Sequence, residues 1–147
     1  MEHLEGILDN LVLFSAVIAW ALAQFLKVVI EFLRVKRIHP GLMFSTGGMP
    51  SSHSAFMAAM ATAVGLRSGF DSTIFALAAA ITMVVMSDAA GVRRAAGRQA
   101  KVINSLVENI ENTGIVLDKK LKELLGHTPV EVACGAILGI IVAFMVM

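Results

Sequence analysis

Four stretches of the chain carry almost no charged residues and predict four membrane-crossing helices. They cover residues 11–33, 52–67, 71–88 and 129–147. Only Lys27 and Glu31 are charged within the first stretch. A hydrocarbon core about 30 Å thick needs about 20 predominantly apolar residues in a helix. Because the uncharged runs in the other three are about 15 to 17 residues long, we expect neighbouring turns or a locally thinner bilayer to complete each crossing.

Small residues predict close packing between these helices. The second and third stretches are rich in alanine, and Gly135 and Gly139 stand at GxxxG spacing in the fourth. Small residues allow helix backbones to approach closely in a membrane, where packing drives association. An alanine-rich helix without a special partner is the open alternative.

A polar stretch, residues 89–126, separates the third and fourth crossings. Two apolar series recur there at helical spacing: Val92, Ala95, Gln99, Val102, Leu106 and Ile110, and then Leu117, Leu121, Leu124 and Leu125. We expect amphipathic helices that lie on the membrane surface or cap the bundle. The expected fold is therefore all-α: a single membrane-embedded domain, residues 1–147, with four transmembrane helices and an amphipathic helical insertion between the third and fourth.

Composition supports a bilayer as the solvent and excludes several classes of protein. Hydrophobic residues make up 57% of the 147 residues and charged residues 16%, and the mean hydropathy is +0.80; soluble domains carry about 25% charged residues. Twelve basic against 11 acidic residues give a net charge of +1, which argues against a nucleic-acid binder. A single cysteine, Cys134, rules out an internal disulfide.

The basic residues predict the orientation of the protein. Four crossings place the two long polar connections, residues 34–51 and 88–126, on one side together with ten of the 12 basic residues. The positive-inside rule makes that side cytoplasmic. Acidic Glu2, Glu5 and Asp9 stand where a signal peptide would be basic, so we expect the first helix to be retained in a multi-pass protein of the cell membrane.

Polar side chains in the first helix predict a face that avoids lipid. They follow one another at helical spacing as Trp20, Gln24, Lys27, Glu31 and Arg34. An ionisable group at mid-membrane costs at least about 2.5 kcal/mol, so we expect this stripe to face the bundle. One interpretation is a Lys27 to Glu31 pair with Arg34 reaching the interface. The other is the cationic wall of an anion site.

The second helix is preceded by Gly47-Gly48-Met49-Pro50-Ser51-Ser52-His53. Glycines permit a sharp turn, Ser51 or Ser52 can cap, and the first N–H groups of a helix point outward at the positive end of its dipole. The segment predicts an anion cradle that contains a histidine. An ordinary glycine-rich turn with a serine cap is the alternative.

The fourth helix begins in a similar way, with Gly126-His127-Thr128-Pro129-Val130-Glu131. Thr128 as N-cap, Pro129 at the first position and Glu131 at the third predict a capping box. Glu131 also follows His127 by four residues, so its carboxylate can hold one imidazole nitrogen and leave the other as a nucleophile or base. We expect the two roles to coexist in part, although one carboxylate oxygen cannot satisfy every donor.

Together these features favour metal-free phosphoryl transfer. Two helix N-termini, each with a histidine, and a cationic stripe fall at one membrane face in the expected topology. One imidazole attacks phosphorus, the other protonates the leaving oxygen, and cations neutralise the charge. Carboxylates at Glu31, Asp88, Glu108 and Glu111 leave a Mg²⁺-assisted scheme open.

These residues resemble the type 2 phosphatidic acid phosphatase (PAP2) superfamily, in particular its short divergent branch. That superfamily reads K-x6-R-P, then P-S-G-H, then S-R-x5-H-x3-D. Lys27 and Arg34 keep the first spacing, with Val35 in place of proline. Pro50-Ser51-Ser52-His53 matches the second motif with Ser52 in place of glycine, and His127 with Glu131 resembles the end of the third. Asp88-Ala89-Ala90-Gly91-Val92-Arg93-Arg94, with Gly97, Gln99 and Asn104, resembles the signature of the divergent branch.

The resemblance implies that His127 forms a phosphohistidine, that Glu131 orients it and that His53 is the general acid. Leu121 stands where the third-motif arginine is expected; Lys120, Lys122, Arg93 and Arg94 are the residues that could supply that charge. Arg93 and Arg94, which follow Asp88 just beyond the third helix, are our preferred candidates; an interfacial anchor is their alternative role. The expected phosphate-binding residues are Lys27, Arg34, Ser51, Ser52, Arg93 and Arg94.

The leading hypothesis is a membrane phosphatase for a lipid phosphate or diphosphate, without metal or other cofactor. The runner-up is a non-catalytic membrane protein that binds an anionic lipid or serves as a transport or assembly subunit. The missing arginine favours the runner-up, and the two histidines disfavour it. The expected partners are the bilayer and a phosphorylated lipid, with a homo-oligomer left open and no nucleic acid.

Overall fold

A computed structural model describes residues 9–36, 48–111 and 126–147, and these residues are helical or in turns, with no strand among them. Five helices follow in order: α2 (Leu11–Val35), α3 (Ser52–Ser68), α4 (Thr73–Ala90), α5 (Val92–Glu111) and α6 (Pro129–Val146). The helices α2, α3, α4 and α6 match the four expected crossings to within two residues at each end. The second amphipathic piece, from Leu117 to Leu125, lies outside the described residues.

Local sequence explains where the helices begin and end. Asn10 caps α2, its side-chain oxygen accepting hydrogen bonds from the Val12 and Leu13 N–H groups. Ser72 caps α4 by accepting from Phe75 N–H at 3.2 Å, which moves the start of that helix from the expected residue 71 to Thr73. Gly69, at φ 90° between α3 and α4, adopts a backbone conformation that a side chain would disfavour.

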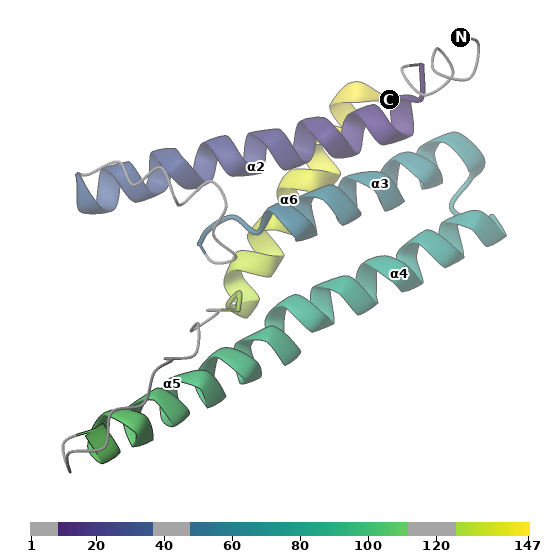
Figure 1. Ribbon diagram of the computed structural model, residues 1–147. Coiled ribbons are helices and arrows are strands. Elements are labelled where there is room, and N and C mark those ends of the chain that lie inside the picture. Colours follow the sequence, from purple (N-terminus) through teal and green to yellow (C-terminus); the bar gives the residue numbers. More distant parts are fainter. Residues whose placement is uncertain (1–8, 37–47, 112–125) are drawn as a thin grey trace, which may run out of the picture.

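Helix α3 occupies the centre of the bundle and packs against α2, α4 and α6 (Figure 1). Taken in order, α2, α3, α4 and α6 run in alternating directions, so α3 and α6 begin at the end of the bundle where α4 finishes. The core is built mainly from small residues: Ala19, Ala23, Ala55, Ala59, Ala63, Val142 and Ala143. The loop residues before α3 and α6 are thereby brought together.

Glycine permits the closest of these approaches. A Cβ atom at Gly135 would overlap the carbonyl oxygen of Ser51, and one at Gly139 would overlap the carbonyl oxygen of Ala55. The GxxxG spacing therefore marks the α6 surface that packs on α3, as the sequence predicts.

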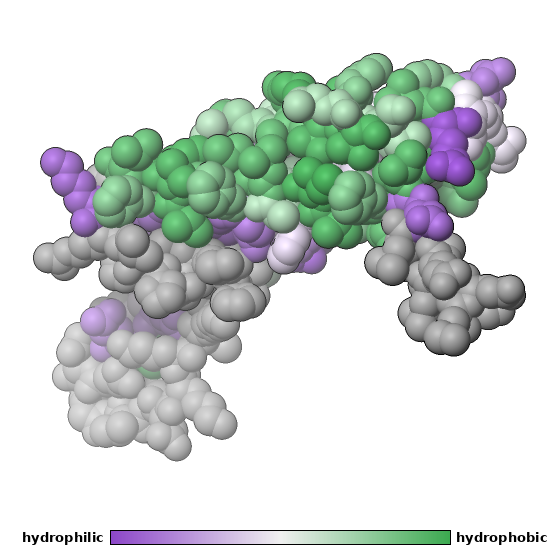
Figure 2. Space-filling view, turned by 90° about the horizontal axis from the view of Figure 1, so that it is seen from above, coloured by the Kyte–Doolittle hydropathy of each residue, from purple (hydrophilic) through white to green (hydrophobic). Residues whose placement is uncertain are grey.

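The exterior of the bundle suits a lipid environment. Large apolar side chains such as Phe25 (65% exposed), Leu33 (70%) and Met83 (71%) point away from the core. Figure 2 shows a broad hydrophobic face with hydrophilic residues at its two ends. Three described segments are long and apolar enough to cross a membrane, namely Leu11–Leu33, Thr73–Glu108 and Pro129–Val146. Helix α3 has 17 residues and is the shortest of the four expected crossings.

Helix α5 does not cap the bundle, which was one of its two expected placements. It continues beyond α4 after Gly91 and projects away from the bundle. Among the described helices it packs only against α4. One residue separates the two helices, and the Gly91 N–H still bonds to Ser87 O at 2.8 Å, so the helical path is not broken there. The first half of the insertion is therefore an extension of α4.

Candidate functional site

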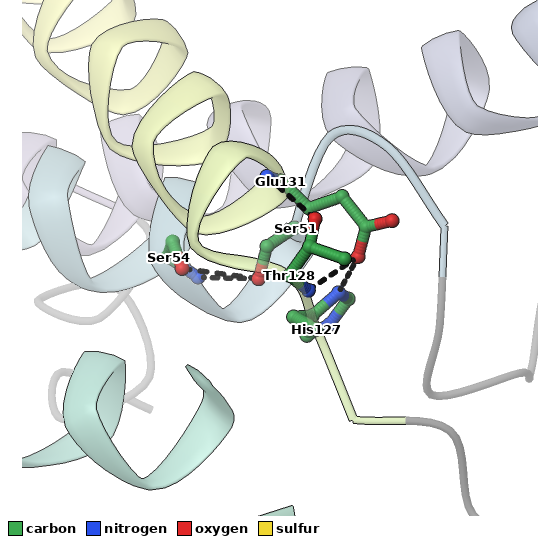
Figure 3. A network of polar contacts seen from close by, with 5 residues as sticks. All are labelled: Ser51, Ser54, His127, Thr128 and Glu131. Carbon is green, nitrogen blue, oxygen red and sulfur yellow. Dashed lines mark hydrogen bonds and ion pairs between the residues drawn. The ribbon is translucent and has the colours of Figure 1, made fainter. Parts of the chain in front are cut away.

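At the start of α6, Glu131 forms a capping box with Thr128 and also contacts His127 (Figure 3). Thr128 Oγ1 accepts from Glu131 N–H at 3.3 Å, and Glu131 Oε2 accepts from Thr128 N–H at 3.0 Å. The same Oε2 atom lies 3.2 Å from His127 Nδ1. The capping box and the histidine contact are confirmed. The two roles coexist on one oxygen, because a carboxylate oxygen has two lone pairs.

This contact favours one tautomer of the imidazole. A carboxylate beside Nδ1 favours the tautomer with the proton on that nitrogen. The lone pair then lies on Nε2, which is the ring nitrogen available to act as a base or a nucleophile. His127 is 3% exposed, so the ring is held by its surroundings as well as by Glu131.

Two backbone hydrogen bonds attach this segment to the other helices. Ser51 N–H donates to Glu131 O at 3.0 Å, and His127 N–H donates to Ala89 O at 3.1 Å. The first joins α6 to the start of α3, and the second joins His127 to the end of α4. The site is therefore assembled from three helices that are distant in sequence.

Ser51 is the N-cap of α3. Its Oγ accepts from Ser54 N–H at 3.3 Å and from the Ser54 hydroxyl at 3.0 Å, and both serines are fully buried. Ser52, 6% exposed, and His53 occupy the first turn, where helical geometry provides no intrahelical acceptor for N–H groups. The start of α3 is thus suited to an anion, whereas Glu131 already places a carboxylate at the start of α6.

His53 lies beside His127. The two ring centroids are 6.4 Å apart, and the ring planes are inclined by 61°. A single phosphate group can contact both rings at this separation. His53 is exposed while His127 is buried, so His53 is the ring of the pair that meets solvent.

Lys27 brings a cation to the site from α2. Its side chain is 3% exposed, and its charge interacts with Glu131 and His127. Gly48, at φ 99°, lies against this side chain, and a Cβ there would come within 2.8 Å of Lys27 Cε.

The rest of the expected polar stripe is placed differently. Trp20 is 46% exposed, so the stripe does not face the bundle along its whole length. The buried face of α2 instead passes through Ser15, Ala19, Ala23 and Lys27. Glu31 is half-buried, and the side chain of Arg34 lies outside the described residues.

Of the two candidate arginines, Arg93 is the one whose charge affects the histidines. Its Nε donates to Asp88 Oδ2 at 2.8 Å, with the two side chains 48% and 39% exposed, which confirms the expected pairing of Asp88 with one of the two arginines. Its charge acts on both His53 and His127. Arg94 is exposed, and its backbone packs against Gly126. Lys120, Leu121 and Lys122 lie outside the described residues.

The surroundings of His127 keep it neutral. Burial lowers the pKa of His127 below its ordinary value; the hydrogen bond and the charge of Glu131 oppose this shift, and the charges of Lys27 and Arg93 reinforce it. A neutral imidazole at pH 7 is the form required of a nucleophile.

Comparison with known protein families identifies the family of the chain. The sequence model of a family described as "Divergent PAP2 family" matches residues 8–142. The chain belongs to the divergent PAP2 family. A relative from Bacillus subtilis (strain 168), described as "Uncharacterized membrane protein YuiD", is 43% identical over 95% of this chain and 95% of its own length. No solved structure gives a significant match. This divergent PAP2 chain is a multi-pass membrane protein.

Sequence reasoning missed three contributors to this divergent PAP2 site. Ser54 supports the Ser51 cap, Ala89 accepts the His127 N–H, and Gly48 makes room for Lys27. The Ser51-x-x-Ser54 spacing is a local signal that could have indicated the first. The Ala89 carbonyl carries no signal in its side chain, so only the tertiary structure identifies it.

Proposed function

We propose that this protein is a membrane-embedded phosphatase that hydrolyses a lipid phosphate or diphosphate through a phosphohistidine intermediate. The observation that carries the proposal is the pairing of His127 Nδ1 with Glu131 at 3.2 Å beside a second histidine. This arrangement supplies an oriented nucleophile and a proton donor at one point. Family membership supports it, since the motif residues of the wider superfamily correspond to these side chains.

The reaction proceeds in two displacements. His127 Nε2 attacks phosphorus, the bond from phosphorus to the leaving oxygen breaks, and His53 gives its proton to that oxygen. Water then attacks the phosphohistidine, His53 takes a proton from the water, and the bond from phosphorus to Nε2 breaks. Inorganic phosphate leaves, and His127 returns to its neutral form. Glu131 stabilises the positive imidazole that forms in the first step.

Cationic and dipolar groups offset the charge of the phosphoryl group. Lys27, Arg93 and the first-turn N–H groups of α3 surround the histidine pair, and preorganised donors of this kind stabilise charge that develops in a transition state. Arg34, Ser51, Ser52 and Arg94 complete the proposed phosphate site as expected from the sequence. Arg93 takes the role of the missing third-motif arginine.

The second candidate is a non-catalytic membrane protein that binds an anionic lipid or serves in transport or assembly. The capping box favours it, because Glu131 has a complete structural role there without chemistry. Under this alternative, His127 and His53 contribute to binding alone.

Phosphate release by purified protein against a panel of lipid phosphates tests the proposal. We expect His127→Ala to abolish turnover while thermal unfolding in detergent stays close to that of the parent. His53→Ala should also impair turnover, but less for substrates with a good leaving group, which needs little protonation. Equal release by parent and His127→Ala would refute the mechanism. Lipid binding without release by the parent would support the second candidate.

A further inference from the structure

An apolar groove between α2 and α6 begins next to the candidate site. Its volume is about 290 Å³, and its lining includes Leu26, Ile30, Pro50, Cys134, Leu138 and Ile141. Residues 134 to 141 of α6 span roughly 10 Å along the helix axis. The groove therefore runs along α6, from near its N-terminus toward the middle of the helix.

Three of the lining residues are close in sequence to residues of the proposed phosphate site. Leu26 precedes Lys27, Pro50 precedes Ser51, and Cys134 follows Glu131 by about one helical turn. The hydrogen bond from Ser51 N–H to Glu131 O, 3.0 Å long, holds the Pro50 end of the groove against the start of α6. Charged groups thus give way to a wholly apolar surface within one turn of α6.

We propose that this groove holds the hydrocarbon tail of the lipid whose phosphate lies at His127, which rests on the phosphate site of the proposed function. A chain that enters between α2 and α6 keeps its headgroup at the membrane face while the tail stays in the bilayer. Bilayer lipids offer a tail the same apolar surroundings as the groove, so the groove adds little affinity. It orients the phosphate, and the headgroup provides the preference over bulk lipid.

Quenching of a tryptophan by brominated lipids tests this placement without requiring turnover. In a Trp20→Phe background, Ile141→Trp puts the reporter on the groove, and Ile140→Trp puts it on the neighbouring exposed position, which is not part of the lining. Vesicles of phosphatidylcholine would contain either dibrominated dioleoyl phosphatidic acid or dibrominated dioleoyl phosphatidylcholine at the same mole fraction.

At position 141 we expect brominated phosphatidic acid to quench at about one tenth of the mole fraction that brominated phosphatidylcholine needs, because charge-assisted contacts select its headgroup. Lys27→Met should remove this preference, and position 140 should show none. Equal quenching by the two lipids at position 141 would overturn the proposal.

A kinetic measurement keeps the proposal testable if the tryptophan variants do not fold. Cys134→Phe fills the groove, whereas Ala133→Phe adds the same ring at an exposed neighbour. We expect Cys134→Phe alone to lower kcat/KM about tenfold for a dioleoyl substrate, with little change for a water-soluble short-chain phosphate ester. Equal losses for both substrates, or for both variants, would overturn the groove. Preferential quenching with no phosphate release from any substrate would refute the phosphatase and leave the tail site standing.

Discussion

The Oε2 atom of Glu131 accepts the Thr128 N–H and also contacts His127 Nδ1. One atom thereby fixes the start of α6 and the tautomer of the candidate nucleophile. The two functions can be separated by mutation, because a glutamine keeps an oxygen for the cap but has no charge for the imidazole.

Glu131→Gln should change both the rate and the pH profile. Glu131 raises the pKa of His127 against the effects of burial, Lys27 and Arg93, so its neutralisation moves that pKa further down. A nucleophile must be neutral, so activity is lost as pH falls through the pKa of His127, and this acid limb should shift to lower pH in the variant. Maximal turnover should drop by roughly 100-fold or more, as when a histidine loses the carboxylate that fixes its tautomer.

Thr128→Ala is the matched control for Glu131→Gln. It removes the cap and should cost about 0.5 to 2 kcal/mol of stability, with the acid limb left in place. An unshifted limb in Glu131→Gln, measured by phosphate release from pH 4 to 9, would contradict the role of Glu131 at Nδ1.

Arg93 and Arg94 are adjacent in sequence but differ in their surroundings. Only Arg93 pairs with Asp88, and its charge acts on both histidines. We expect Arg93→Ala to lower kcat at least about tenfold, since a guanidinium that contacts a phosphoryl group is worth roughly 1.5 to 3 kcal/mol. Arg94→Ala should lower kcat by a smaller factor. If both variants keep parental turnover and lose affinity for anionic vesicles, the pair is an interfacial anchor.

Helix α6 meets α3 through glycines that leave no space for a side chain. Gly139→Ala raises helix propensity by up to about 1 kcal/mol, yet its Cβ would overlap the Ala55 carbonyl and lie 2.8 Å from Ala59 N. We expect a net destabilisation of about 1 to 3 kcal/mol, measured by thermal unfolding in detergent. Ala133→Leu, at an exposed position of the same helix, should be close to neutral. Unchanged stability of Gly139→Ala would show that the helices separate at little cost.

Helix boundaries, caps and neighbouring pairs were predictable because they depend on residues close in sequence. The Thr128 and Glu131 capping box, the Glu131 contact to His127 and the Asp88 pair with Arg93 all join residues that are at most five positions apart. The buried face of α2 was not predictable from the sequence. In a helix surrounded by lipid, apolar residues face both the bundle and the bilayer. The polarity of the residues therefore did not show that Ser15 is buried and Trp20 exposed.

The path of α5 and the contacts between helices also could not be predicted from the sequence. Gly91 was compatible with a turn, but the α4 hydrogen bonds continue to it and α5 extends onward. The meeting of His127 with Ala89 depends on how α6 returns through the bundle. Such contacts are made by backbone atoms, which are the same in nearly every residue, so the residue types do not indicate them.

The whole molecule gathers positive charge around the histidine pair from several helices. Lys27 comes from α2, the N–H groups from α3, and Arg93 from the start of α5. We therefore expect turnover to survive EDTA, because these groups supply the electrostatic stabilisation that a metal would give. Within the described ranges, no three histidine, cysteine or acidic side chains cluster as metal ligands. Loss of activity on chelation, restored by Mg²⁺, would instead require a metal-assisted scheme.

The two backbone hydrogen bonds that close the site, from Ser51 to Glu131 and from His127 to Ala89, have a consequence for biosynthesis. His127 and Glu131 are the last residues of the proposed site to leave the ribosome. A nascent chain that ends before α6 therefore lacks both hydrogen bonds as well as the proposed nucleophile. Under the proposed function, hydrolysis in the host membrane would begin only with chains that have completed the insertion of α6.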